Sequence, residues 1–505
     1  MPKRAMSNLR RAVMAVICAT IFWACGADKQ KADTGQTAKV IEQQTPWGLE
    51  RFVLPEFPDR IIAITEMGAD TASANNQKAI QKAIDLCSEK GGGTVSLPAG
   101  VWRTSYLELR DNVNLRLEKG SVLSFSDNPD DYAVPTFTRW EGMECMNYHP
   151  LLYAKGKKNI AITGKGRIEG NGKAWWHMAR KGKKITLPKL YTQALEGVAP
   201  KDRNCLEYEE GSFLRPSMIQ LINCENILVQ GIEIGSGPMW TTHFVYCKNV
   251  VAQRLKVRTN GHNNDGLTPD SCEKMLIDDC DFSTGDDCIV IKSGLNEDGW
   301  RVGKPSSRIV IRNSKTKRGH GGVVIGSEMS GGVNKVYALN CDFGGTDRGL
   351  RVKSMKGRGG VIEDIWFENI QMKNIRREAI MLNMRYGSSS TPPRGDKVPV
   401  FRNFNFKNIV STGSKHAVRV VGLPESNVDG MNFENMRLQS KKGIEVSDIS
   451  DCVFDSLELK AETPSLIHVK DGNNIAVKRL YGSVPVSEAL LISGEKNKDV
   501  RIVKD

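Results

Sequence analysis

A short pattern of residues recurs along the chain from about residue 113. Each copy holds a polar turn and a run of alternating β-branched or apolar residues, as in Asn159-Ile160-Ala161-Ile162, Asn226-Ile227-Leu228-Val229 and Asn249-Val250-Val251-Ala252. The copies recur at roughly 23 to 36 residues, and no helical period long enough for a βαβ crossover separates the strands. The pattern predicts an all-β fold, a parallel β-helix (a solenoid) whose coils stack at about 4.8 Å.

One amphipathic helix is expected before the coils. Asn75 or Asn76 is its candidate N-cap, Gly91-Gly92-Gly93 ends it, and a 3.6-residue apolar period runs through Ala79, Ile80, Ala83, Ile84 and Cys87. A solenoid must cover its open apolar end, so we expect a short N-terminal capping helix. A β-propeller is the alternative architecture, but the Trp/Asp or Gly-rich signature of its blades is not visible in the sequence.

The N-terminal residues predict export. Four basic residues precede an uncharged apolar run, 12–24, that is too short to span a bilayer; they are Lys3, Arg4, Arg10 and Arg11. The run ends at Phe22-Trp23-Ala24-Cys25-Gly26, which resembles a bacterial lipoprotein box with Cys25 as the acylated residue; ordinary export cleavage is the alternative. We therefore expect an export or lipoprotein signal (1–24), a polar tether (25–50) and a single β-helix domain (51–505). The exported protein would face the periplasm or the cell surface and touch the membrane only through the anchor at Cys25.

The charge of the chain favours a polyanionic partner. Lys plus Arg is 71 and Asp plus Glu is 58, a net charge of +13. Removing residues 1–24 removes four positive charges and no negative ones, which leaves +9. Such a surface suits nucleic acid, anionic lipid or an acidic polysaccharide. Export argues against nucleic acid, and no dense Lys/Arg run with interleaved aromatic residues is present.

The cysteine residues favour core packing over metal binding. The chain has 12 Cys, two of them in the signal region, with no CxxC pair and no Cys/His cluster, so a zinc site is not expected. Export permits disulfides, but the sequence does not pair them. Cys224, Cys247 and Cys272 recur 23 and 25 residues apart. We interpret them as an internal stack of adjacent coils.

Four polar clusters lie between residues 260 and 355. They are Gly261-His262-Asn263-Asn264-Asp265-Gly266, Thr284-Gly285-Asp286-Asp287-Cys288, Gly319-His320-Gly321-Gly322 and Arg351-Val352-Lys353. The successive gaps from Asp265 to Asp286, His320 and Arg351 are 21, 34 and 31 residues, each close to one coil. Stacked coils would bring three carboxylates, one imidazole and two cations into one groove. Asp278, Asp279 and Asp281 have no partner motif and are interpreted as turn and strand residues.

These side chains suit the hydrolysis of an acidic glycan. Three close carboxylates repel one another, so that one is easily held protonated while the others stay ionised. A protonated acid opposite an ionised base is what glycosidic hydrolysis requires. Arg351 and Lys353 alternate with Val352, so on a strand both would face the groove and bind a substrate carboxylate.

The ordered motifs resemble those of the polygalacturonases, glycoside hydrolase family 28, which are right-handed parallel β-helices. The matching residues are Asn263-Asn264-Asp265, Gly285-Asp286-Asp287, Gly319-His320-Gly321 and Arg351-Val352-Lys353. Gly164-Lys165-Gly166, Gly170-Asn171-Gly172, Trp175-Trp176, Arg215-Pro216 and Pro238-Met239-Trp240 resemble the bacterial, often exo-acting branch. Asn264 and Gly237 depart from the family's common Thr and Ser, and neither departure removes an ionisable group.

The resemblance implies a role for each matched residue. Asp286 would be the general acid, and Asp265 and Asp287 would hold and activate the attacking water in an inverting reaction. His320 would help to keep Asp286 in its acid form. Arg351, Lys353 and Asn263 would bind a galacturonate beside the scissile α-1,4 bond. No metal and no cofactor is implied, and solenoids of this kind are usually monomers.

Three alternatives stay open at this point. A rhamnogalacturonan-directed hydrolase would share the fold and the motifs. A pectate lyase would use Ca²⁺ and an Arg base on the same fold. A non-catalytic glycan-binding β-helix would explain the fold and the charge, but not the carboxylates at one-coil spacing. Exo or endo action is not readable from the sequence, although the resemblance favours exo action on pectic polysaccharide.

Overall fold

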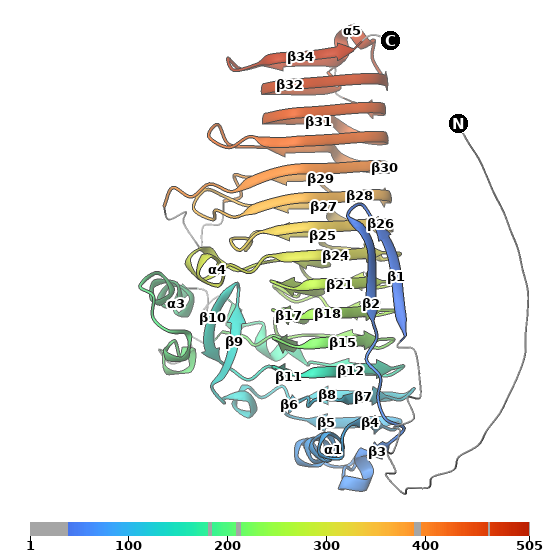
Figure 1. The fold of residues 1–505 in the computed structure, drawn as a ribbon, viewed down its shortest axis with the longest axis vertical. Coiled ribbons are helices and arrows are strands. Elements are labelled where there is room, and N and C mark those ends of the chain that lie inside the picture. Colours follow the sequence, from blue (N-terminus) through green and yellow to red (C-terminus); the bar gives the residue numbers. More distant parts are fainter. Residues whose placement is uncertain (1–38, 180–183, 209–213, 388–394, 463–464, 504–505) are drawn as a thin grey trace, which may run out of the picture. The chain divides into compact units, whose positions relative to one another are not determined.

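Parallel strands that stack in successive coils make up most of the described chain from Ile61 onward (Figure 1). The computed structural model describes residues 39–179, 184–208, 214–387, 395–462 and 465–503. Each of these strands pairs in parallel with a strand of the adjacent coil. Ile227, for example, lies opposite Val250 of the next coil. The predicted parallel β-helix is therefore confirmed, and the propeller alternative is excluded.

Three ladders of parallel strands run along the coils. The first ladder contains β3 (Ile61–Ala63), β4 (Gly93–Leu97), β7 (Val113–Leu117), β12 (Lys158–Gly164), β15 (Glu225–Gln230), β18 (Lys248–Gln253), β21 (Glu273–Asp278), β24 (Ser306–Arg312), β26 (Val333–Gly344), β28 (Val361–Lys373), β30 (Val400–Val421), β31 (Val428–Ala461), β32 (Ile467–Gly482) and β34 (Lys498–Val503). The second contains β6 (Leu107–Glu108), β11 (Leu152–Lys155), β14 (Ile219–Ile222), β17 (Thr242–Val245), β20 (Leu267–Asp270), β23 (Ile289–Ile291), β25 (Lys315–Gly326), β27 (Thr346–Lys353) and β29 (Glu378–Asn383). The third contains β5 (Gly100–Thr104), β8 (Ser121–Phe125), β13 (Arg167–Glu169), β16 (Glu233–Gly235), β19 (Lys256–Arg258) and β22 (Asp281–Ser283), and its last strand pairs with β25.

Asparagines at the start of the repeat fix the turns into the first ladder. Asn112, Asn159, Asn226 and Asn249 have φ angles between 52° and 61°, a left-handed conformation that Asn tolerates better than most residues. Their side chains also stack, because the amide of each of the last three donates to the Oδ1 of the preceding asparagine at 3.0 Å. The recurring Asn of the sequence thus satisfies both the turn and the stacking of the coils.

The interior of the coils is apolar, and it includes the predicted cysteine stack. Cys224, Cys247 and Cys272 immediately precede β15, β18 and β21, whose first residues lie in register. All ten cysteines among the described residues are buried and free of disulfides. Their thiols therefore serve as small core side chains, as the spacing predicted.

The capping helix is also present. α1 (Gln77–Glu89) contacts β3, β4, β6 and β7 at the first coil and buries Ile80, Ala83, Ile84 and Cys87. The side chain of Asn75 accepts the backbone N–H of Gln77 at 2.9 Å. At the other end of the coils, α5 (Val486–Ala489) and β33 (Leu490–Ser493) lie beside β32.

The predicted tether is wrong for residues 40–50. Here β1 (Val40–Thr45) and β2 (Gly48–Val53) form an antiparallel hairpin that packs on the outer surface of the first ladder (Figure 1). Phe52 is fully buried, and both carboxylate oxygens of Glu50 lie 2.7 Å from the guanidinium of Arg308. The polar composition of this segment concealed a strand alternation in which one face is covered. The signal (1–24), Cys25 and the rest of the tether lie outside the described residues.

Phe52 is the fully buried apolar side chain of the hairpin. Replacing a fully buried Phe with Ala costs about 3–5 kcal/mol, so we expect Phe52→Ala to release the hairpin from the first ladder. Limited proteolysis should then cut the segment 39–54 faster, while the coils stay resistant. Leu49→Ala, at a side chain that is 48% exposed, is the control. Equal cleavage rates for wild type and Phe52→Ala would contradict the expectation.

A group of inserted elements stands off the coils on one side (Figure 1). It contains the antiparallel hairpin of β9 (Thr136–Trp140) and β10 (Met143–Asn147), together with α3 (Thr186–Leu195) and α4 (Asn296–Val302). A buried ion pair of 2.8 Å joins Arg139 of the hairpin to Asp270 of β20, and Arg203 pairs with Asp298 of α4 at 2.7 Å. The Arg139–Asp270 pair fixes the hairpin against the second ladder. No helix in the described part of the chain is long and apolar enough to cross a membrane.

Candidate active site

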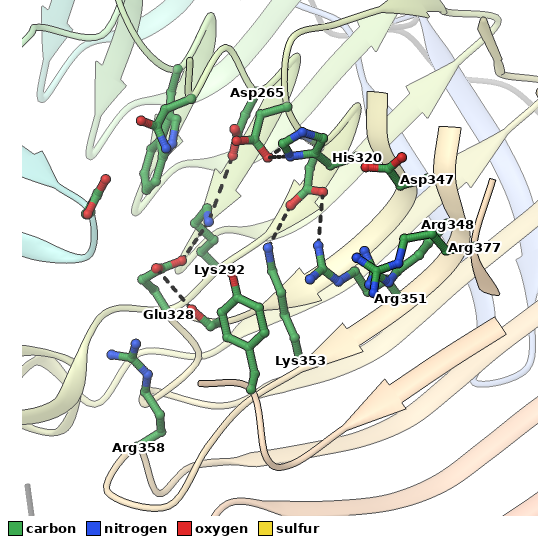
Figure 2. A pocket seen from close by; sticks show the side chains of 17 residues that line it. Asp265, Lys292, His320, Glu328, Asp347, Arg348, Arg351, Lys353, Arg358 and Arg377 are labelled. Atoms are coloured by element: carbon green, nitrogen blue, oxygen red, sulfur yellow. Dashed lines mark hydrogen bonds and ion pairs between the residues drawn. The ribbon is translucent and has the colours of Figure 1, made fainter. Parts of the chain in front are cut away.

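A polar cavity of about 350 Å³ opens beside the second ladder, next to the β9–β10 hairpin (Figure 2). Six carboxylates and seven basic side chains share its wall with four other residues. The lining consists of Glu141, Trp240, Asn263, Asp265, Asp286, Asp287, Lys292, His320, Ser327, Glu328, Asp347, Arg348, Arg351, Lys353, Arg358, Arg377 and Tyr386. This cavity contains all seven residues that the sequence singled out for catalysis and substrate binding.

The register of the second ladder explains why the four motifs meet. Asp265 precedes β20, and Asp286 and Asp287 precede β23, with Leu267 paired to Ile289. Ile289 pairs with Val323 of β25, the strand that carries His320. The next strand, β27, places Arg351 opposite Val324 and Lys353 opposite Gly326. The prediction of one groove from one-coil spacing is therefore confirmed.

Asp286 and His320 form a hydrogen-bonded pair. The imidazole Nδ1 lies 3.0 Å from Asp286 Oδ1, and the backbone N–H of Asp287 donates to the same oxygen at 2.9 Å. Burial raises the pKa of Asp286, but His320, Lys353 and Lys292 outweigh burial and lower that pKa to about 2. The hydrogen bond to Asp286 in turn raises the pKa of His320 against the effect of burial. His320 thus lowers the pKa of Asp286 in the protein without substrate, which is the opposite of the effect expected from the sequence.

Asp265 has the opposite electrostatic environment. Its side chain is almost fully buried, and burial together with the charge of Asp286 raises its pKa well above the usual range, while Lys292 acts in the other direction. Lys292 Nζ lies 3.9 Å from Asp265 Oδ2 but only 2.6 Å from Glu328 Oε2, so its hydrogen bond goes to Glu328. The surroundings therefore favour the protonated form of Asp265 and the ionised form of Asp286.

Asp287 is the carboxylate that lies beside both cations of the fourth motif. It is 1% exposed, Lys353 Nζ donates to its Oδ2 at 2.8 Å, and a guanidinium nitrogen of Arg351 lies 3.8 Å from its Oδ1. Both cations also lie over the ring of Tyr386, at 5.3 and 5.4 Å from its centroid. Arg351 and Lys353 thus lie beside Asp287 and also line the cavity.

The first motif is held in place by hydrogen bonds beneath the cavity. Asn263 has a φ of 54°, and its Oδ1 accepts from Arg215 at 2.9 Å. Asn264 is fully buried, and its amide donates at 2.9 Å to the carbonyls of Gly237 and Met239. Asn264 therefore positions the turn that carries Asp265, and Gly237 takes part in the same contact.

The structure adds cavity residues that the sequence did not single out as site residues. Lys292 follows β23, Glu328 follows β25 and Tyr386 follows β29. Arg348 lies within β27, as Arg351 does. Glu141 comes from the turn of the β9–β10 hairpin, and Arg358 comes from the loop after β27. Arg348 lies three residues before Arg351, an odd spacing that would place it on the opposite face of a regular strand, so the alternation gave no signal for it. Glu141 and Arg358 lie outside the repeat and carry no such signal.

The aspartates that were interpreted as turn and strand residues lie outside the cavity. Asp278 pairs with Arg312 at 2.8 Å, and Asp281 pairs with Arg258 at 2.8 Å and with Lys317 at 3.2 Å. Of the tryptophans near these elements, Trp240 lines the cavity. Trp366 packs on Trp47, and Trp300 lies under Lys397.

A parallel β-helix with a groove of paired carboxylates and cations is the arrangement of a polysaccharide-cleaving glycoside hydrolase. The sequence profile of glycosyl hydrolases family 28 matches residues 194–455. The chain belongs to this family and is a glycoside hydrolase. Membership in this family excludes the pectate lyase and the non-catalytic glycan-binding β-helix as alternatives.

Relatives and solved structures resemble most of the chain. It is 30% identical over 433 residues to an exo-poly-alpha-D-galacturonosidase of Dickeya chrysanthemi, an alignment that covers 79% of this chain and 70% of the relative. It is 29% identical over 383 residues to a probable polygalacturonase of Vitis vinifera, covering 74% and 72%. A crystal structure of a hyperthermoactive exopolygalacturonase from Thermotoga maritima matches with a TM-score of 0.72 and 33% identity, covering 84% of this chain and 93% of that one.

The described residues contain no group of three or more His, Cys, Asp or Glu side chains arranged to hold a metal ion.

Proposed function

We propose that this enzyme hydrolyses α-1,4-galacturonosyl linkages in galacturonan or oligogalacturonides, from a chain end and with inversion. The observation that carries the proposal is the meeting of three carboxylates in one cavity beside Arg351 and Lys353, where the pKa of Asp265 is raised and that of Asp286 is lowered. The names of the relatives from Dickeya and Thermotoga support an exo-acting galacturonan hydrolase.

Substrate binding would move the proton to Asp286. A galacturonate carboxylate that binds Arg351 and Lys353 cancels part of the positive charge that lowers the pKa of Asp286. With a single proton in the coupled carboxylate group, Asp286 becomes the acid as Asp265 becomes the base. Asp286 then gives its proton to the leaving oxygen, and Asp265 with Asp287 takes one from the water that attacks the anomeric carbon. The group ends the reaction with one proton, as it began.

The β9–β10 hairpin would make the action exo. Its turn places Glu141 in the cavity wall, and Trp140 donates its Nε1–H to the carbonyl of Arg215 at 2.9 Å. A groove closed by this hairpin would admit the end of a chain rather than its middle. Galacturonate monomer should therefore be the first product.

The role of His320 gives a pH prediction. In His320→Gln the imidazolium that lowers the pKa of Asp286 is absent, so this pKa rises and the doubly protonated, inactive group forms at a higher pH. We expect the acid limb of the kcat/KM profile on trigalacturonate to move to higher pH than in the wild type. Dividing the kcat/KM of the variant by that of the wild type at each pH cancels the effect of substrate titration. An unmoved acid limb would contradict this account of the pair.

The proposed function is tested on polygalacturonate in the presence of a chelator. Reducing ends, the ultraviolet absorbance of unsaturated products and the anomeric configuration of the first product, by NMR, are followed together. New reducing ends without absorbance, monomer as the first product and an inverted anomer are the expected results. Absorbance would indicate elimination, and no product would refute galacturonan as the substrate.

We also propose that the enzyme is an exported lipoprotein acylated at Cys25, and that it is a monomer. The basic residues, the apolar run and the position of Cys25 support the anchor. Labelling cells with a fatty-acid probe should mark the wild type but not Cys25→Ser.

A further inference from the structure

Cations lie on two separate sides of the catalytic carboxylates. Figure 2 shows Arg348, Arg351 and Arg377 together on one side of the cavity, and Arg358 well apart from them on the other, with Lys292 and Glu328 closer to Asp265. The motif residues Arg351 and Lys353 account for one carboxylate of the substrate. They leave Arg358 without a role.

Arg358 is a buried guanidinium with few partners. It is 3% exposed, and no ion pair within 4 Å joins it to another described residue. Its Nη1 donates to the amide oxygen of Asn296 at 3.2 Å, while its Nε has no hydrogen-bond partner among the residues that the structure places. Burial lowers its pKa, and Glu328 and Glu141 offset this only in part. Because Glu328 is already paired with Lys292 at 2.6 Å, the buried positive charge of Arg358 has no carboxylate paired with it among the described residues, and an anionic ligand would stabilise it.

The inserted elements hold Arg358 in this position. Asn296, the first residue of α4, accepts from the guanidinium and donates its own amide to Tyr191 of α3 at 2.6 Å. Trp300 of α4 donates to the backbone carbonyl of Arg358 at 2.9 Å. A long side chain that α4 holds both at its guanidinium and at its backbone is suited to recognition rather than to general electrostatic attraction.

From this geometry we propose that Arg358 binds the carboxylate of a second uronate, so that the cavity recognises a carboxylate on each of the two sugars that the scissile bond joins. Arg351 and Lys353 bind one carboxylate, and Arg358 binds the other. The inference rests on the proposed function and narrows it. The substrate must present two consecutive, unesterified uronates, and a backbone in which a neutral sugar alternates with the uronate lacks half of the recognition.

The experiment uses three trigalacturonates: one unesterified, one with a methyl ester on the non-reducing terminal sugar, and one with the ester on the middle sugar. Each is offered to the wild type, Arg358→Gln, Arg358→Lys and Arg351→Gln, and kcat/KM is measured for release of the terminal sugar. Arg385→Gln is the matched control, because this arginine is exposed, pairs with Asp448 at 3.1 Å and lies outside the cavity. Thermal unfolding reports whether each variant is folded.

The wild type should prefer the unesterified substrate over both esters. Arg358→Gln should lose roughly 10- to 100-fold of that preference at one sugar only, and Arg351→Gln at the other sugar. Arg358→Lys keeps the charge but not the planar fork, so it should keep part of the preference, and it serves as the test if Arg358→Gln does not fold. Unchanged preference at both sugars in a folded Arg358 variant would overturn the inference and leave the proposed function intact. Failure of the wild type on all three substrates would overturn both.

Discussion

Asp286→Asn and Asp265→Asn should each lower kcat on oligogalacturonides by about 10³- to 10⁴-fold, in the upper part of the range for removal of a general acid or base. Asparagine keeps the size of the side chain but can neither give a proton to the leaving oxygen nor take one from water. The two variants should differ in folding, because Asp265 is buried with a raised pKa. Asp265→Asn removes a group whose ionisation opposes folding as the pH rises, so its melting temperature at pH 8 should not fall below that of the wild type.

Asp281→Asn is the matched control for both variants. Asp281 belongs to the same coil as Asp286, but it pairs with Arg258 and Lys317 on the third ladder. Its replacement should leave kcat within about twofold, as is usual for a residue away from the site. A loss of activity in Asp281→Asn comparable to that in Asp286→Asn would mean that the carboxylates act through stability rather than through chemistry.

The fold could be predicted because each coil repeats the same physical requirements. A left-handed turn needs Asn, as at Asn226 and Asn249, and the strand that follows must alternate because one side faces the interior. The same periodicity stacked Cys224 on Cys247. The hairpin at 40–53 was missed because it does not repeat, and because its buried face is provided by single residues such as Phe52.

The centre of the site could be predicted for the same reason, and its periphery could not. Asp265, Asp286, His320 and Arg351 lie on consecutive coils, so their spacing in sequence became proximity in space. Glu141 and Arg358 reach the cavity from a hairpin and a loop whose positions depend on buried ion pairs and on α4.

The ionisation of the carboxylates is set by burial and by distances that the sequence does not contain. His320 was placed correctly beside Asp286, yet its effect on the pKa of Asp286 has the opposite sign to the one expected, because the hydrogen bond between them favours the ionised carboxylate and raises the pKa of the imidazole. A motif therefore identifies which groups meet, whereas burial and the neighbouring cations decide which of them holds the proton.

Lys353→Met should have the second-largest effect, with kcat/KM on trigalacturonate lowered by roughly 10²- to 10³-fold. Its ammonium makes a 2.8 Å hydrogen bond to Asp287, and both side chains are nearly buried. Removing one partner of a buried pair leaves an uncompensated charge at a cost of about 3–5 kcal/mol. The variant should therefore lose thermal stability as well as activity.

The two roles of Lys353 can be separated in the same experiment. If Lys353 binds the substrate carboxylate, KM should rise; if it only holds Asp287, kcat should fall with KM unchanged, and we expect both changes together. Lys317→Met is the control, because this lysine pairs with Asp281 through a side chain that is 61% exposed, and a surface pair of this kind is worth at most about 1 kcal/mol. A kcat/KM in Lys353→Met within a factor of a few of the Lys317→Met value would show that Lys353 has no role in substrate binding or catalysis. It would also contradict the proposal that a substrate carboxylate bound to Lys353 raises the pKa of Asp286.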